Sequence, residues 1–151
     1  MKIEQKIKEM GLTLPPPPKP AGSYIPISIS NNTVYTSGML PFEEGKLKHK
    51  GSFPLDLSIE KGQFLSKLCV LNALSAVKNA ISDLDKIKGI KKLSGFIKSD
   101  KGFTDQAKIL NGASDLLVEI FGEKGQHARS AIGVSELPLG SPIEIELIID
   151  I

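Results

Sequence analysis

The sequence contains few of the residues that build disulfides and metal sites. Among its 151 residues there is one cysteine, Cys69, and there are two histidines, His49 and His127. One cysteine cannot form an intrachain disulfide, which fits a reducing compartment, and three such scattered residues lack the spacing of metal ligands. We therefore expect no metal site, with Cys69 buried as a small apolar residue of a helix and His49 facing solvent.

Aromatic residues, net charge and long apolar runs are scarce as well. Aromatic residues make up 5% of the chain and the formal net charge is +2. The chain lacks the interleaved aromatic residues of an RNA-binding sheet and the strong positive charge that favours nucleic acid. No apolar run approaches the ~18 residues that span a bilayer, and residues 1–4 do not begin a secretory signal. These absences predict a cytoplasmic protein that binds neither nucleic acid nor membranes.

The residues that are present predict one domain preceded by an arm. A chain of this length can bury a single core. Residues 3–12 have the apolar spacing of a short helix, and the four prolines 15–18 then form a stiff extended segment. We interpret residues 1–20 as an appendage that lies against a domain formed by residues 21–151. The alternative is a flexible arm that docks on a neighbouring subunit.

The rest of the chain alternates between strand and helix patterns. Apolar residues at steps of three and four indicate two long helices, the first with Ser58 as N-cap and the second ended by Gly122, and β-branched or alternating runs indicate strands. The expected elements are two strands in a hairpin at 24–29 and 33–38, a helix at 57–81, a strand at 87–98, a helix at 103–121, and strands at 127–134 and 143–150. This order predicts an α+β fold in which one mixed sheet has both helices packed on a single face.

One face of that sheet is then left without helices. In the last strand one side is wholly apolar and the other is mixed. The apolar side has Ile143, Ile145, Leu147 and Ile149, and the mixed side has Glu144, Glu146, Ile148 and Asp150. A mixed face with apolar residues on it is a candidate contact in a symmetric oligomer.

Arg129 and two carboxylates, Glu144 and Glu146, stand among apolar residues of the last two strands. If these strands pair as a hairpin, Arg129 and Glu144 flank the same turn and approach each other. They could then form a surface ion pair worth under ~1 kcal/mol. Alternatively, Arg129 binds a substrate carboxylate as a planar fork while Glu144 holds a water or moves a proton. The residues alone favour the ion pair.

Several motifs occur in the order seen in one known family. They are Ala21-Gly22-x-Tyr24, Tyr35-Thr36-Ser37-Gly38-x-Leu40-Pro41, Asn111, Ala128-Arg129-Ser130-Ala131-Ile132-Gly133-Val134, Leu137-Pro138 and Ile143-Glu144-Ile145-Glu146. With them residues 21–151 resemble the RidA/YjgF family of reactive enamine and imine deaminases, older members of which were called endoribonuclease L-PSP. The proline-rich beginning is similar to a longer branch of that family.

The resemblance implies a chorismate-mutase-like fold and a homotrimer with active sites between subunits. It also implies an enzyme similar to the 2-iminobutanoate/2-iminopropanoate deaminases, which hydrolyse 2-aminoacrylate and related imino acids to 2-oxo acids and ammonia without a cofactor. The expected partner is thus a small imine or 2-oxo acid that bears a carboxylate. A non-catalytic module that binds small carboxylates or regulates a partner is the alternative, and a ribonuclease ranks third.

The resemblance also assigns roles to residues. Arg129 would clamp the substrate carboxylate and Glu144 would place the attacking water. The expected substrate-binding residues are Tyr24, Ser37, Gly38, Asn111 and Arg129. Three positions depart from the family pattern: Ala131 replaces a common cysteine, Met39 a glutamine and His127 a proline. His127 could face the cleft and titrate, but we expect it to be a satisfied structural histidine.

Overall fold

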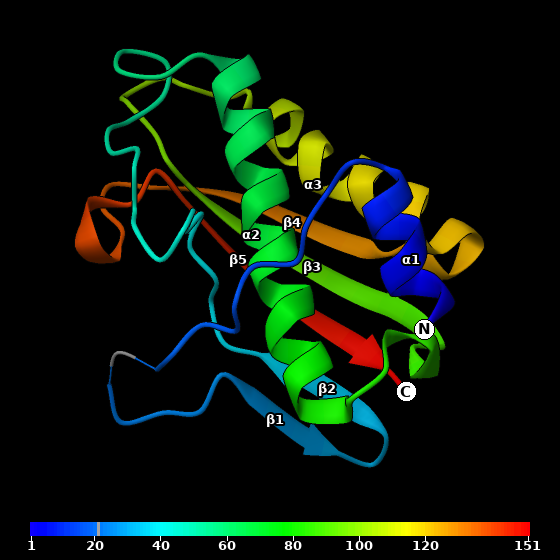
Figure 1. Cartoon of the computed structure of the whole chain (residues 1–151). Coiled ribbons are helices and arrows are strands. Elements are labelled where there is room, and N and C mark those ends of the chain that lie inside the picture. The colour runs from blue at the N-terminus through cyan, green and yellow to red at the C-terminus, as the bar shows by residue number, and fades with distance from the viewer. Residues whose placement is uncertain (21) are drawn as a thin grey trace.

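A five-stranded mixed sheet and two long helices form the framework of the computed structural model, which describes residues 1–20 and 22–151 (Figure 1). Ala21, the first residue of the Ala-Gly-x-Tyr motif, lies outside the described residues. The elements are α1 (Lys2–Glu9), β1 (Ile27–Ser30), β2 (Thr33–Thr36), α2 (Ile59–Ile81), η1 (Leu84–Lys86), β3 (Gly89–Lys98), α3 (Gln106–Phe121), η2 (Gly122–Gly125), β4 (Ala128–Val134), η3 (Pro138–Gly140) and β5 (Ile143–Asp150). The predicted α+β class and the predicted order of strands and helices are confirmed.

The strands lie in the order β1-β2-β5-β3-β4. All neighbours are antiparallel except β3 and β4, which are parallel. The last two strands do not pair as a hairpin, the condition for an ion pair between Arg129 and Glu144, because β3 lies between β4 and β5. The reason is the connection through α3: a helix between two strands carries the chain back over the sheet, so β4 runs parallel to β3 at its outer edge.

The first two strands form the predicted hairpin, although β1 is shorter than expected. Asn31 and Asn32 have φ angles of 48° and 61°. Positive φ at both central residues is what a two-residue hairpin turn requires, and asparagine tolerates it well. Pro26 precedes the strand and has no N–H to donate, so regular pairing begins only at Ile27.

Both long helices have the predicted boundary signals. The Ser58 hydroxyl accepts a hydrogen bond from the Lys61 N–H at 3.1 Å, which confirms Ser58 as the N-cap of α2. Gly122 follows α3 with φ of 62°, a conformation that glycine adopts without strain. Cys69 is fully buried in α2, as expected. Among the described residues α2 is also the single helix long and apolar enough to cross a membrane by length and composition, and 67% of that apolar window is buried, as in an ordinary core helix.

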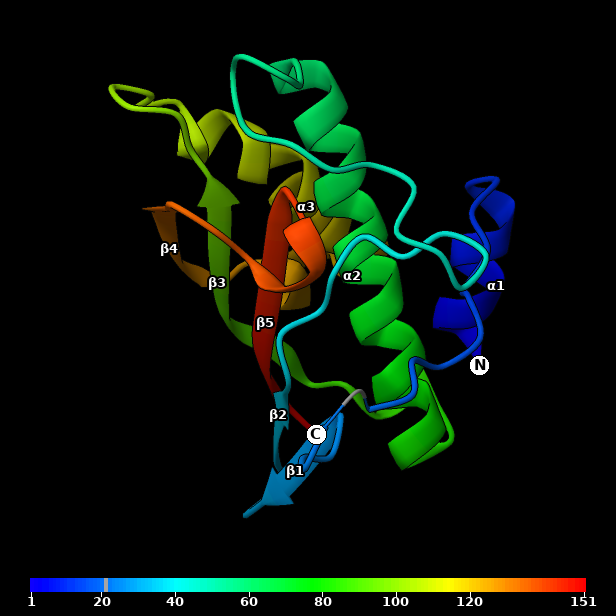
Figure 2. The same ribbon diagram turned by 90° about the vertical axis from the view of Figure 1, so that its left-hand side faces the viewer.

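The two helices cover one face of the sheet and leave the other bare (Figure 2). The apolar side of β5 is completely buried under them, as the alternation predicts. The bare side carries Tyr35 and Ile148 opposite each other on β2 and β5, and Phe96 and Ile132 opposite each other on β3 and β4. Tyr35 and Ile132 are exposed. This bare face is therefore mixed in character, and no helix of residues 1–20 or 22–151 covers it.

Residues 1–20 lie against their own subunit: α1 contacts α3 and η1, and the Lys78 ammonium of α2 lies 4.0 Å from the Glu4 carboxylate (Figure 2). Ile7 is buried in the main core. The Asp85 carboxylate accepts the N–H groups of Lys2 and Ile3, each at 2.8 Å, and so satisfies the start of α1. The Met1 ammonium and these N–H groups hold the pKa of Asp85 well below its usual range. The division of the chain at residue 20 stays a prediction.

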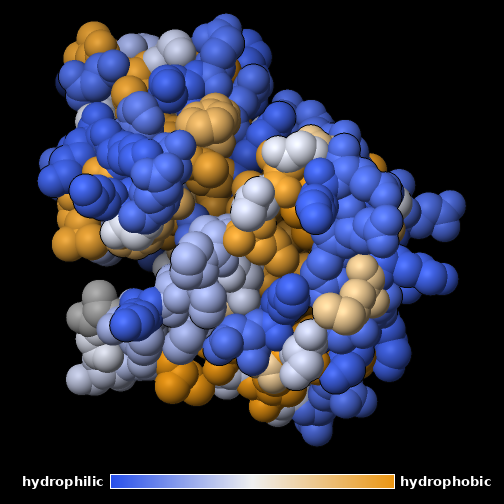
Figure 3. Space-filling view, in the orientation of Figure 1, coloured by the Kyte–Doolittle hydropathy of each residue, from blue (hydrophilic) through white to orange (hydrophobic). Residues whose placement is uncertain are grey.

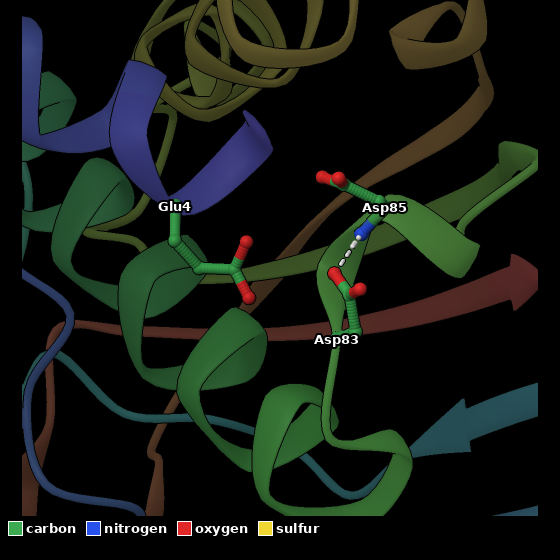
Figure 4. Close-up of side chains that lie close together, drawn as sticks. All are labelled: Glu4, Asp83 and Asp85. Atoms are coloured by element: carbon green, nitrogen blue, oxygen red, sulfur yellow. Dashed lines mark hydrogen bonds between the residues drawn. The ribbon is translucent and has the colours of Figure 1, made fainter. Parts of the chain in front are cut away.

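Three carboxylates, those of Glu4, Asp83 and Asp85, gather at this contact (Figure 4). Asp83 accepts the N–H of Asp85 and lies 3.3 Å from the Met1 ammonium, which Asp85 also contacts. One Glu4 oxygen accepts the N–H of Leu84 at 3.3 Å. These bonds dock α1 onto η1, and they account for the grouping of the acids.

The crossing of α2 and α3 generates a stability prediction at Gly112. A methyl group there would lie 2.7 Å from the Ser66 hydroxyl and would overlap the carbonyl oxygen of Gln63. Gly→Ala in a helix normally stabilises by about 1 kcal/mol. Here we expect Gly112→Ala to lower the free energy of unfolding by about 1–3 kcal/mol, because the helices must move apart. Urea unfolding, with the exposed Glu119→Ala as control, measures this. A variant more stable than wild type would show that the helices do not cross so closely.

Candidate active site

Glu144 lies where β2 separates from β5. The backbones of the two strands pair from Thr33 to Tyr35. At Thr36 the side-chain hydroxyl, in place of a backbone carbonyl, accepts the N–H of Leu147 at 2.9 Å. Backbone pairing resumes at Met39, opposite Ile145. Gly38 lies within this interruption, and a methyl group there would overlap the Glu144 carboxylate. A glycine is thus required at position 38 for the carboxylate to lie across the strand.

A cavity of about 570 Å³ opens beside this carboxylate. Four of the predicted site residues line it: Tyr24, Ser37, Gly38 and Glu144. The Ser37 hydroxyl donates to the carbonyl of Ile25 at 2.7 Å, so its proton is already engaged and the side chain ties the strand to the segment before β1. Sequence reasoning missed the other lining residues, among them Pro18, Lys19 and Pro20 of the arm. The proline run identifies a stiff segment, but its location at a cavity depends on tertiary packing.

The environment of Glu144 favours its protonated form more than water does. Burial raises the pKa of Glu144, and the nearby Glu146 carboxylate on the same face of β5 raises it further. The side chain is about half buried. Its carboxylate has no ion pair or hydrogen bond within residues 1–20 and 22–151, and it is thus free to accept a proton or hold a water molecule.

Arg129 lies on the opposite face of the sheet. It pairs with Leu93, whose side chain is buried under the helices, whereas Glu144 pairs with Phe96 on the bare face. The Arg129 guanidinium donates from Nη1 to Asn111 Oδ1 at 2.9 Å and to Ser114 Oγ at 3.1 Å, both on α3. The ion pair between Arg129 and Glu144 that a hairpin would allow does not form in the subunit, because β3 separates the two strands.

His127 completes a chain of hydrogen bonds that holds Arg129. Its Nδ1 lies 2.6 Å from the carbonyl oxygen of Gly125 and its Nε2 lies 2.9 Å from Ser114 Oγ. The carbonyl can only accept, so Nδ1 carries a proton and donates it, and in the tautomer with its single proton on Nδ1 the ring accepts the Ser114 hydroxyl at Nε2. The hydroxyl oxygen in turn accepts from Arg129. Both ring nitrogens are satisfied, which is the expected structural role.

Ser114 is the second contact of Arg129 that sequence reasoning missed. A signal was available, because Ser114 follows Asn111 by three residues on α3 and residues so spaced share a helix face. A small depression of about 300 Å³ opens over Ser114, His127 and Arg129. The predicted residues therefore form two groups: Tyr24, Ser37, Gly38 and Glu144 line one cavity, and Arg129 lines the other, where Asn111 accepts a hydrogen bond from it.

Comparison with known proteins agrees with this fold. Residues 4–151 match the model of the YjgF/chorismate mutase-like family, which also carries the name endoribonuclease. Protein TCP17 of Trypanosoma cruzi is 33% identical over 99% of this chain and 94% of its own. Two crystal structures are similar over 99% of this chain. Atu1372 of Agrobacterium tumefaciens, a protein of unknown function, is 41% identical with a TM-score of 0.92, and the match covers 92% of that chain. A protein of Shewanella oneidensis named as an endoribonuclease is 35% identical with a TM-score of 0.96, and the match covers 99% of that chain.

One more distant structure contains a ligand. TdcF of Escherichia coli was crystallised with bound serine; it is 23% identical, with a TM-score of 0.65 over 89% of this chain and 93% of its own. At this level of identity the likeness shows the fold alone. A small amino acid thus binds to a protein of this fold.

The two causes of the Glu144 pKa shift can be separated by Glu146→Gln. This change removes the neighbouring charge and leaves the burial of Glu144. We expect the titration midpoint of Glu144 to fall yet remain above the ordinary value of about 4.3, because burial is the larger cause. Carboxyl ¹³C NMR of labelled glutamate measures the midpoint, and exposed Glu60→Gln on α2 is the control. An unchanged midpoint in Glu146→Gln would contradict the assigned coupling.

Proposed function

The chain belongs to the YjgF/chorismate mutase-like family, and we propose that it hydrolyses imino acids related to 2-aminoacrylate to 2-oxo acids and ammonia. The observation that carries the proposal is the pair of complementary groups on one sheet. Glu144 is a half-buried carboxylate without a partner among the described residues, beside a cavity. Arg129 is a guanidinium held in place by Asn111 and Ser114, with part of its donor fork left for a ligand.

These groups are proposed to act together across a subunit contact. Within one subunit they lie on opposite faces of the sheet, with β3 between their strands. A second copy that covers the bare face, with its exposed Tyr35 and Ile132, could bring its own Arg129 to the cavity of Glu144. We propose a homotrimer with such shared sites, as the resemblance to imine deaminases implies.

In the proposed reaction the substrate carboxylate binds the Arg129 fork, for which the planar guanidinium is well shaped. 2-Aminoacrylate first takes a proton from solvent at C3 and becomes the iminium form of the imine. Glu144 accepts a proton from a water molecule while the water oxygen bonds to the iminium carbon, which gives a carbinolamine. Glu144 then returns that proton to the nitrogen, the C–N bond breaks, and ammonia leaves with the electron pair of that bond. The hydroxyl proton passes to solvent as the oxygen becomes the carbonyl of the 2-oxo acid. The raised pKa of Glu144 suits a base that works near neutral pH.

The main requirement of such a reaction is that the protein positions the substrate and the attacking water. The imine carbon is already electrophilic, so holding the substrate beside an oriented water can supply most of the acceleration. The hydrogen bonds from Arg129 to α3 fix the guanidinium before substrate arrives. No cofactor takes part in these steps.

A non-catalytic carboxylate-binding module is the second candidate. The serine bound to TdcF supports it, because that protein holds a small carboxylate within the same fold. Ribonuclease action, which the family name carries, ranks last. His127 has both ring nitrogens engaged, and His49 lines neither of the two cavities described above, so these cavities offer no pair of histidines for acid-base cleavage of RNA.

Replacing Arg129 tests the proposed function. We expect Arg129→Ala to lower kcat/KM for freshly generated 2-aminoacrylate roughly 100-fold, because a charged hydrogen-bonded contact to the substrate is lost. The kcat/KM of Arg129→Lys should lie between those of the wild type and Arg129→Ala, since a lysine keeps the positive charge but lacks the paired donors of the guanidinium. Ammonia release is the readout, and Lys67→Ala, an exposed cation on α2, is the matched control.

Two results would overturn the hydrolase. One is equal ammonia release by wild type and Arg129→Ala with unchanged circular dichroism. The other is wild-type protein that binds a 2-oxo acid, loses that binding in Arg129→Ala, and turns over no imine; this result would support the binding module instead.

A further inference from the structure

The cavity beside Glu144 is larger than a three- or four-carbon imino acid needs. Its volume of about 570 Å³ lies within the range of ~300–1,000 Å³ that holds drug-sized ligands. Glu144 and Lys19 are the two charged side chains among the described residues that line it. The remainder of the wall is predominantly apolar, so the space away from Glu144 is suited to a group that avoids water.

The N-terminal arm supplies one wall of this space. Pro18 and Pro20 line the cavity, and Pro26, just before β1, continues the wall. Upstream the arm is fixed to the subunit, because Ile7 is buried in the core and the Ser75 hydroxyl donates to the carbonyl of Pro15. Prolines have few conformations to lose. The wall is therefore present before any ligand binds.

The facing wall comes from η3. In Figure 3 this side of the molecule is notched between the end of the arm and the lobe that carries η3. Pro138 and Leu139 line the cavity there, and Leu139 is 61% exposed. Tyr24 is 49% exposed at the same cavity. Two large side chains thus present apolar surface to one open space, and a ligand that covered them would be stabilised by the burial of that surface.

We propose that this space takes the substrate side chain, and that the preferred substrates are imines of amino acids with bulky apolar side chains, aromatic or branched aliphatic. The inference rests on the proposed hydrolysis at Glu144. The reacting carbon lies at the polar end beside Glu144, and the side chain extends between the proline wall and Leu139. A substrate with a second carboxylate would instead have to lose water against apolar residues, with Lys19 as its one cationic neighbour in the lining.

The test compares imines made freshly by an amino-acid oxidase from phenylalanine, leucine and alanine. We expect kcat/KM of the wild type to be highest for the phenylalanine or leucine imine. Leu139→Asn removes apolar surface at a residue with φ of 60°, which asparagine adopts readily. We expect this change to lower the ratio of kcat/KM for the phenylalanine imine over the alanine imine roughly tenfold. Leu55→Asn is the matched control, because Leu55 is 82% exposed and does not line the cavity. We expect its ratio to equal that of the wild type.

A binding measurement on the unaltered protein supports the same inference without relying on a variant. Calorimetry with the product analogues phenylpyruvate and pyruvate should show tighter binding of phenylpyruvate. The inference is overturned if pyruvate binds as tightly, if the alanine imine is the best substrate, or if Leu139→Asn leaves the ratio unchanged. It is also overturned if the glutamate imine is preferred and Lys19→Ala removes that preference. Failure to hydrolyse any imine would contradict the proposed function. Hydrolysis with a preference for the alanine imine would contradict only the inference about the substrate side chain.

Discussion

The position of β3 between β4 and β5 is the constraint on which the rest of the account depends. Because α3 connects β3 to β4, these strands run parallel, and β4 takes the outer edge. The same connection lays α3 across β4, so Asn111 and Ser114 meet Arg129 there. On the other side of β3, β5 buries its apolar face under the helices and presents Glu144 to the bare face. One topological fact thus separates the arginine from the carboxylate.

The arginine side of this arrangement is preorganised by neutral groups. The backbone carbonyl of Gly125 accepts a hydrogen bond from the ring of His127, the ring is hydrogen-bonded to the Ser114 hydroxyl, and the Ser114 oxygen accepts a hydrogen bond from Arg129. Each member is satisfied by the next, so no rearrangement is needed before a carboxylate binds. The glutamate side differs, because the Glu144 carboxylate is left without a hydrogen bond among the described residues. Its partner in function has to come from a ligand, from water or from another copy of the chain.

Local signals were sufficient to predict the helices, their caps, the first hairpin and the faces of β5. Helical spacing, Ser58 and Gly122 act within a few residues of the chain, and so does the alternation from Ile143 to Asp150. Strand pairing is not local, and the segment that contains Pro138 and Leu139 looks like a hairpin turn although it carries the chain across β3. Because strand pairing is not local, the sequence identified the motif residues but did not show on which face of the sheet each of them lies. The arm shows this limit too, since its prolines predict stiffness but not the cavity they line.

The central claim is that one working site takes Arg129 from one copy and Glu144 from another. The most direct test of this claim is to mix two variants. Subunits with Arg129→Ala and subunits with Glu144→Gln are assembled together in equal amounts. Native mass spectrometry verifies that mixed oligomers have formed. Each variant alone should be inactive, and the mixture should recover about a quarter of wild-type ammonia release, since one contact in four then joins an intact Arg129 to an intact Glu144. A verified mixture no more active than either variant alone would contradict the account.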